Sequence, residues 1–297
     1  MAYQSAKLTY QEAGKGNRET LMDVLVNISP TETPMFSTFG KVKAEGTTHQ
    51  TLTDTLANAA VNAHIEGGDY SFTTPAARSR VSNYTQIFVT GVEVSDTQRV
   101  VSKAAVEDEF IYQMTKKMKE HARDIEKALV EGTGNAGTSA TARELKGVLA
   151  WITTTNITGT GTGLEPLTES MFNDCLQAIW DQGGSPDTAW VNGRQKRKIS
   201  AFTDSATKFV DADAKKLTAT VGVYDSDFGR IKIVLDRFMP PSVVAITQTD
   251  LWKVAVLRPT RKVDVAKIAS STRAVIETEL TLEARNEAGS GKITELS

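Results

Sequence analysis

The sequence predicts an α+β fold, and three observations in chain order support this class. Residues 45–93 are rich in Thr and contain Gly, which favours extended structure. Residues 103–131 have the apolar spacing of one long amphipathic helix, and residues 274–285 alternate apolar and acidic side chains like a half-buried strand. The first stretch has too few large apolar residues to form its own core, so we expect it to lie on a neighbouring subunit. This order of parts indicates a protein that assembles rather than one that catalyses.

The composition sets limits on the class of protein. With 297 residues, the chain can form one large domain or two modest ones. Its net charge of -2 lacks the basic surplus of a protein whose main task is to grip nucleic acid. The single cysteine, Cys175, fits a small buried side chain better than a nucleophile. The N-terminus lacks a signal-peptide pattern and no apolar run is long enough for a membrane span, so we expect cytosolic synthesis and no membrane.

The first 95 residues divide into an arm and a loop. Residues 1–20 are polar, residues 18–28 have the spacing of a short helix, and Met35, Phe36 and Phe39 then form an apolar plug. Two extended segments, residues 47–53 and 78–94, flank a turn at Gly67 and predict a long hairpin. An isolated hairpin is only marginally stable, so this one should pack on something, and a solvated loop is the alternative. Its balanced charges suit docking to another copy: Lys41, Lys43, Arg78 and Arg80 against Glu45, Asp54, Glu66 and Asp69.

The long helix is predicted over about residues 102–132, with Ser102 as its N-cap and Gly132 as its stop. Such a helix is roughly 40 Å long. Both charge signs are mixed on its polar face, which therefore predicts a solvated surface. Its apolar stripe consists of Val106, Phe110, Met114, Met118, Ala122, Ile125 and Leu129.

The remaining chain predicts an α/β subdomain followed by strands. Over residues 164–246 we expect helices at 168–182 and 194–202, a buried strand at 189–191, and strands at 221–224, 231–235 and 243–246. Residues 251–258 form a nearly continuous apolar strand. In residues 274–285, Ile276, Leu280 and Leu282 should face the core while Glu277, Glu279 and Glu283 face water.

Motifs that would carry chemistry are incomplete. Residues 289–292 (Gly-Ser-Gly-Lys) lack the earlier glycine and the following Ser or Thr of a phosphate-binding loop. None of the three histidines has a partner at metal-ligand spacing, and no Gly-x-Ser-x-Gly elbow is present. Asp225 and Asp227 fit a structural turn better than an acid pair. The sequence therefore predicts no enzyme activity, no catalytic residues, no cofactor and no metal.

Several strings in order resemble the major capsid proteins of tailed bacteriophages with the Hong Kong 97-type fold, in particular an uncleaved subfamily. They are NISPTETP at 27–34, NYTQI at 83–87, RDIEKAL at 123–129, FND at 172–174, NGRQK at 192–196 and EARNE at 283–287. The resemblance covers nearly the whole chain. It implies an N-terminal arm (1–44), an extended β-hairpin loop (45–95), a peripheral domain (96–163) with the spine helix, an axial α/β domain (164–246) and C-terminal strands of the peripheral β-sheet domain (247–297).

The resemblance also implies a function and partners. Copies would assemble through pentamers and hexamers into an icosahedral phage head, in the host bacterial cytoplasm, around double-stranded DNA held non-specifically. Separate scaffolding, portal or decoration proteins are further expected partners. Some relatives form Lys–Asn cross-links; Lys41, Lys43 and Asn286 do not align with that chemistry, so noncovalent locking is expected.

Within that interpretation, we predict that Glu66 and Asp69 of one copy pair with Arg78 and Arg80 of another. Such pairs set register more than stability. Two alternatives are an encapsulin-like compartment of the same fold and a soluble α/β-type hydrolase, which would need a clustered Ser, His and acid.

Overall fold

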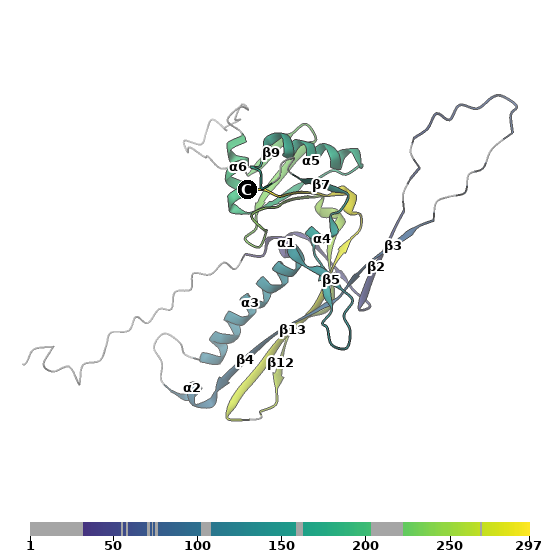
Figure 1. Cartoon of the computed structure of the whole chain (residues 1–297). Coiled ribbons are helices and arrows are strands. Elements are labelled where there is room, and N and C mark those ends of the chain that lie inside the picture. Colours follow the sequence, from purple (N-terminus) through teal and green to yellow (C-terminus); the bar gives the residue numbers. More distant parts are fainter. Residues whose placement is uncertain are drawn as a thin grey trace, which may run out of the picture.

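The computed structural model describes residues 32–54, 56–57, 59–69, 72, 74, 77–101, 108–158, 163–202, 222–267 and 269–297. Figure 1 shows a body built on a long helix beside a sheet, a second body above it, and a long loop that projects away from both. The first 31 residues, including the helix predicted at 18–28, lie outside the described residues.

The first body is a sheet in the order β1-β12-β13-β4. Strand β1 runs parallel to β12, and the other neighbours are antiparallel. The bounds are Gly40–Lys43 for β1, Gln86–Ser95 for β4, Trp252–Val265 for β12 and Ser271–Ala284 for β13. The prediction of strands at both C-terminal segments is confirmed, and both are longer than predicted.

The long helix, α3 (Glu109–Glu131), lies along one face of this sheet (Figure 1). It begins later than predicted, because Asp108 has extended backbone angles and its side chain accepts a hydrogen bond from the Phe110 N–H. Ser102 and Val106 lie outside the described residues. The predicted stripe is wrong at Met118, which is 52% exposed, and buried His121 replaces it. The reason is geometric: four-residue steps from Phe110 drift around the helix, whereas eleven residues return to the same face.

The predicted hairpin over 45–95 is only partly correct. Strands β2 (Thr48–Thr53) and β3 (Ser79–Tyr84) pair with each other as an antiparallel ribbon. Beyond Thr85, however, β4 leaves the ribbon and pairs with β13 from Ser271↔Ser95 to Leu280↔Gln86. Alternate β4 side chains, Phe88, Val92 and Val94, are buried because that strand packs against α3.

The second body is a sheet in the order β7-β14-β11-β8-β10-β9 with two helices. The predicted helices and strands of residues 164–246 are present, and β8 is buried throughout. Two further strands of this sheet, β7 and β14, come from outside that range. They pair in parallel with each other at one edge of the sheet. The bounds are β7 Thr155–Thr158, α5 Glu169–Asp181, β8 Thr188–Val191, α6 Gly193–Phe202, β9 Val223–Ser226, β10 Gly229–Leu235, β11 Val244–Thr247 and β14 Gly291–Thr294.

The other α-helices and one small hairpin are short. They are α1 Pro34–Thr38, α2 Asp96–Val100, α4 Val148–Trp151, and the small hairpin of β5 Thr133–Asn135 with β6 Glu144–Lys146. Two glycines allow α3 to meet this hairpin closely. The Gly147 N–H donates to the Gly132 carbonyl at 2.8 Å, and a Cβ on Gly147 would lie 2.6 Å from the Gly132 nitrogen. Gly132 therefore ends the helix as predicted and also permits this contact.

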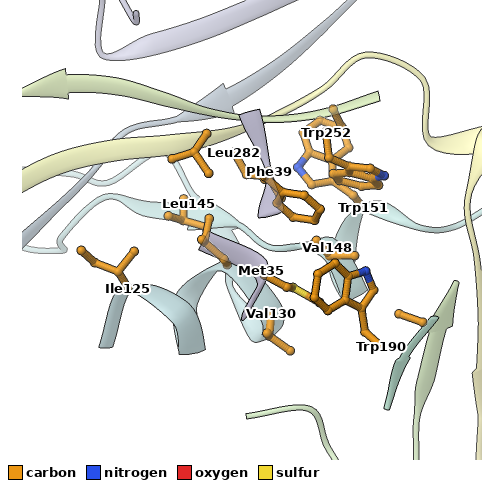
Figure 2. Close-up of a cluster of buried hydrophobic side chains, with 14 of the residues drawn as sticks. Met35, Phe39, Ile125, Val130, Leu145, Val148, Trp151, Trp190, Trp252 and Leu282 are labelled. Carbon is orange, nitrogen blue, oxygen red and sulfur yellow. The ribbon is translucent and has the colours of Figure 1, made fainter. Parts of the chain in front are cut away.

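The plug of the arm is buried between the two bodies (Figure 2). Met35 and Phe39 are 0% and 2% exposed, which confirms their predicted role. The Phe39 ring stacks on Trp252 of β12 and meets Trp190 of β8 edge-on, with centroid distances of 6.3 and 5.7 Å. One arm side chain thus contacts an indole from each sheet, so the arm contributes to the core that joins them.

One face of β13 was predicted to face water, but it is mostly buried. Ile276, Leu280 and Leu282 are buried as expected, but Glu279 and Glu283 are also buried, at 4% and 8% exposure. The hairpin β5–β6 and the ribbon β2–β3 cover this face, and both contact β13. The alternation of polar and apolar residues along a strand does not show whether a segment distant in the sequence covers its polar face.

Candidate functional site

The part of the loop beyond the ribbon exposes large apolar side chains. Leu56, Val61, Ile65 and Phe72 are 98%, 96%, 83% and 94% exposed. Figure 1 shows this part standing away from both bodies. Exposed apolar side chains gathered on one segment usually mark an interaction surface. We call these four residues the loop apolar set.

The four predicted contact residues lie on the same loop and are all exposed. Glu66 stands at the tip turn beside Gly67, whose φ of 79° is a conformation that glycine adopts readily. Arg78 forms an ion pair with Asp54, its Nε lying 3.4 Å from Oδ2. Within the described part of the chain, neither Glu66 nor Asp69 pairs with Arg78 or Arg80. The predicted pairing between copies stays a prediction.

The loop meets the body at a polar contact that we call the loop base, made by His49, Asn83 and Thr85. Asn83 is 3% exposed, and its amide nitrogen donates to the carbonyls of Lys146 and Leu282 at 3.0 and 2.7 Å. Its amide oxygen accepts from the N–H groups of Tyr84 and Lys146 at 2.9 and 2.8 Å. Because a buried amide is costly unless its groups are paired, this network fixes the position of β3 against β13 and β6.

Thr85 connects the loop base to the buried carboxylate of Glu279. The Thr85 hydroxyl donates to Oε1 at 2.9 Å, and the Arg143 guanidinium donates to the same oxygen at 2.9 Å. The Arg258 Nε donates to Oε2 at 2.8 Å. Thus Glu279 joins the loop base, the β5–β6 connection and strand β12 at one point. Charge-assisted bonds of this kind are stronger than neutral ones.

His49 makes the third contact of the loop base. Its Nε2 lies 2.7 Å from Oε2 of Glu283, whose other oxygen accepts from Arg285 Nε at 2.8 Å. Burial alone would raise the pKa of Glu283, but the hydrogen bonds from Arg285 and His49 outweigh it and hold that pKa below its usual value. Arg285 and His49 therefore favour the charged form of Glu283 beneath β2.

The loop base has no recognisable signature in the sequence. His49 and Asn83 stand in a polar, Thr-rich segment, and Glu279 and Glu283 follow an alternation that predicts solvent exposure. Their convergence depends on pairing between segments almost 200 residues apart.

The other candidate side chains have structural surroundings. Cys175 is fully buried, and burial raises its thiol pKa to about 12, which suits the predicted structural role rather than a nucleophile. His121 lies within hydrogen-bond distance of the Thr90 and Thr278 hydroxyls at 2.9 and 2.8 Å, and burial lowers its pKa. Lys292 of the incomplete phosphate motif lies on β14 and donates to the Leu149 carbonyl.

The described residues contain neither a metal-binding group nor a membrane-spanning helix. No group of three or more His, Cys, Asp or Glu side chains among them could hold a metal ion. No helix in the same residues has the length and apolar content needed to cross a membrane.

The comparisons with known proteins all point to phage capsid proteins. A family model described as SU10 major capsid protein matches residues 3–297. The major capsid protein of Escherichia phage Phieco32 is 26% identical over 343 residues, covering 98% of this chain and 97% of that protein. The capsid asymmetric unit of cyanophage A-1(L) has a TM-score of 0.73 at 14% identity and covers 97% of this chain and 98% of that one. A solved chain of Mycobacterium phage Bobi has a TM-score of 0.66 at 12% identity, and the match covers 97% of this chain and 99% of that one.

Proposed function

Because the chain belongs to the SU10 major capsid protein family, we propose that its copies assemble through pentamers and hexamers into an icosahedral head around double-stranded DNA. The family is one of structural proteins of the phage capsid, and the chain has the Hong Kong 97-type fold. The net charge of -2 is compatible with an inner surface that tolerates DNA without gripping it. Assembly takes place in the host bacterial cytoplasm, and the protein catalyses no reaction.

The observation that carries this proposal is the contrast between the two ends of the loop. The loop base is buried and fully hydrogen-bonded at Asn83, whereas the loop apolar set is almost completely exposed. A free subunit therefore presents an apolar surface at the end of a fixed support. A neighbouring copy supplies the cover, and many such contacts add up by multivalency.

The loop of one copy lies across the spine helix or the peripheral sheet of the next. Both elements expose apolar side chains that suit this contact. On α3, Ile111 and Met118 are 64% and 52% exposed; on β4, Ile87 and Val89 are 45% and 59% exposed. Burial of these side chains against the loop apolar set is the main favourable term of the contact.

Ion pairs between copies set the register of that contact. Glu66 and Asp69 at the tip meet Arg78 and Arg80 of another copy, and the pair of Arg78 with Asp54 in one copy is exposed and weak enough to exchange. Locking is noncovalent. Scaffolding, portal and decoration proteins are further partners of the assembled particle.

Charge reversal tests the proposal. We expect Arg78→Glu with Arg80→Glu to block particle formation while circular dichroism shows a folded subunit. The matched control adds Glu66→Arg and Asp69→Arg to the same chain, which exchanges the signs and should restore particles. Normal particles from the first variant would contradict the proposed pairs, and so would failure of the exchanged variant to assemble.

A further inference from the structure

The arm reaches the body at a junction of three segments, namely α1, α3 and the residues after β10. Glu126 of α3 is 0% exposed, and its two carboxylate oxygens accept the backbone N–H groups of Met35 and Phe36 at 2.7 and 2.9 Å. These bonds attach the start of α1 to the helix. Met35 and Phe39, which follow in the arm, fill the core between the two sheets.

A second buried carboxylate lies at the same junction. Asp236, directly after β10, is 1% exposed, and its Oδ1 accepts the Phe238 N–H at 2.8 Å. Its Oδ2 has no hydrogen-bond partner among the described residues. Burial is the main cause that raises the pKa of Glu126, and the negative charge of Asp236 adds a smaller contribution. For Asp236, the charge that adds to the effect of burial on its pKa is that of Glu131. Two carboxyl groups that are both buried at one junction, with one oxygen unpaired, favour the binding of a proton.

The surrounding charges do not neutralise the pair. Among the described residues, neither Glu126 nor Asp236 forms an ion pair. The nearby Arg123 lies over the Phe238 ring, with its guanidinium carbon 5.9 Å from the centroid, and Lys41 of β1 lies over the Phe36 ring at 4.4 Å. The charged groups around the junction are Arg123, Asp124, Lys127 and Glu131 on α3, Asp236 and Arg237 after β10, and Lys41 on β1.

We propose that Glu126 and Asp236 form a proton-binding site that holds the arm to the junction of the two bodies. With a proton bound, the two carboxyl groups together carry one negative charge at most, and α1 stays attached to α3. Without it, two negative charges stay buried with no ion pair among the described residues, and this favours opening of the arm because opening returns Glu126 to water. Attachment of the arm thus depends on pH. This dependence is separate from the proposed contacts between copies.

The direction of the pH dependence follows from the proton affinities. Burial raises the pKa of Glu126 to about 7; the N–H groups of Phe36 and Met35 oppose the rise and Asp236 adds to it. Burial also raises the pKa of Asp236. When the arm opens, Glu126 regains its ordinary pKa of 4.5. Closed arms therefore bind a proton that open arms lose, so attachment weakens as pH rises from about 4.5 to about 7 and then levels off.

Hydrogen exchange of the intact protein measures this opening directly. Protection of residues 33–44 is compared at pH 5.5, 6.5 and 8, after correction for the intrinsic exchange rate. We expect the wild-type protection factor to fall about tenfold between pH 5.5 and 6.5, as one linked proton requires, and to change less above about pH 7. Glu126→Gln cannot ionise, so its protection should show no such fall.

Two further variants complete the experiment. Asp236→Asn removes one of the two charges, so its arm should stay more protected than the wild type at pH 8. Glu120→Gln, on the same helix but on the surface with Lys117, should keep the wild-type profile. A flat wild-type profile, or a Glu126→Gln profile with the wild-type slope, would overturn the proposal. If Glu126→Gln does not fold, an Asp236→Asn profile identical to the wild type overturns it.

Discussion

Single side chains at the loop base connect segments that are remote in sequence. Glu279 is the clearest case, because its carboxylate accepts hydrogen bonds from Thr85, Arg143 and Arg258. Each donor belongs to a different segment: the end of the ribbon, the β5–β6 connection and β12. The direction in which the loop leaves the body therefore depends on one buried acid.

Replacement of this acid tests that dependence. We expect Glu279→Gln to lower the free energy of unfolding by about 2–3 kcal/mol, because a neutral amide cannot accept from all three donors or balance the charge of the two arginines. The two arginines keep some contact with water, at 28% and 39% exposure, which limits the loss. Denaturant titration of the variant measures it.

Glu277 provides the matched control on the same strand, two residues away. Its side chain is 27% exposed, and it pairs with Arg258 and Arg261 at 3.7 and 3.3 Å. We expect Glu277→Gln to cost less than about 1 kcal/mol, as exposed pairs do. Equal losses for the two variants would contradict the special role of Glu279.

The sequence could predict the chemistry of some residues but not their partners. Burial of Cys175, Met35 and Phe39 follows from local apolar spacing, and the structure confirms all three. The acids of β13 could not be placed, because their burial comes from a covering hairpin and ribbon. The burial of His121 was not predicted, because histidine is polar. In the structure, its ring nitrogens pair with two threonine hydroxyls, which makes burial possible.

At the scale of elements, the loop consists of a supported ribbon and an exposed remainder. The ribbon β2–β3 pairs from Thr48↔Tyr84 to Thr53↔Ser79 and rests on β13. Beyond it, the loop apolar set has no cover among the described residues. The ribbon therefore supports the subunit's own fold, and the remainder is available for contacts between copies.

This division predicts separable effects on folding and assembly. We expect Leu56→Ser, Val61→Ser and Phe72→Ser together to leave the melting temperature of the subunit unchanged, because these side chains are already in water. Particle yield by sedimentation should fall at least tenfold. The control, Ala57→Ser with Asn62→Ser at two exposed positions of the same loop, should assemble normally. A large fall in melting temperature would show that the loop apolar set serves the subunit's own core instead.

The element predictions succeeded where the signal was local. The periodicity of α5 and the apolar runs of β8, β10 and β11 identified them. The start of α3 was misplaced, because the extended backbone of Asp108 is not visible in the apolar stripe. Strand β4 was assigned to the wrong neighbour and β14 was not predicted as a strand, because pairing between distant segments is decided by packing rather than by composition.

For the whole molecule, the order of parts predicted more than any single motif did. The sequence of arm, extended loop, long helix, α/β body and C-terminal strands was enough to predict the fold, and the comparisons bear it out. The division of the chain at residues 44, 95, 163 and 246 stays a prediction. What joins the parts, namely the arm plug between two indoles and the carboxylates at the loop base, required the three-dimensional arrangement.

The mass of the purified particle tests self-assembly most directly. Light scattering combined with negative-stain microscopy should give megadalton shells, or pentamers and hexamers that become shells when conditions change. A stable monomer or dimer under all conditions would contradict the account.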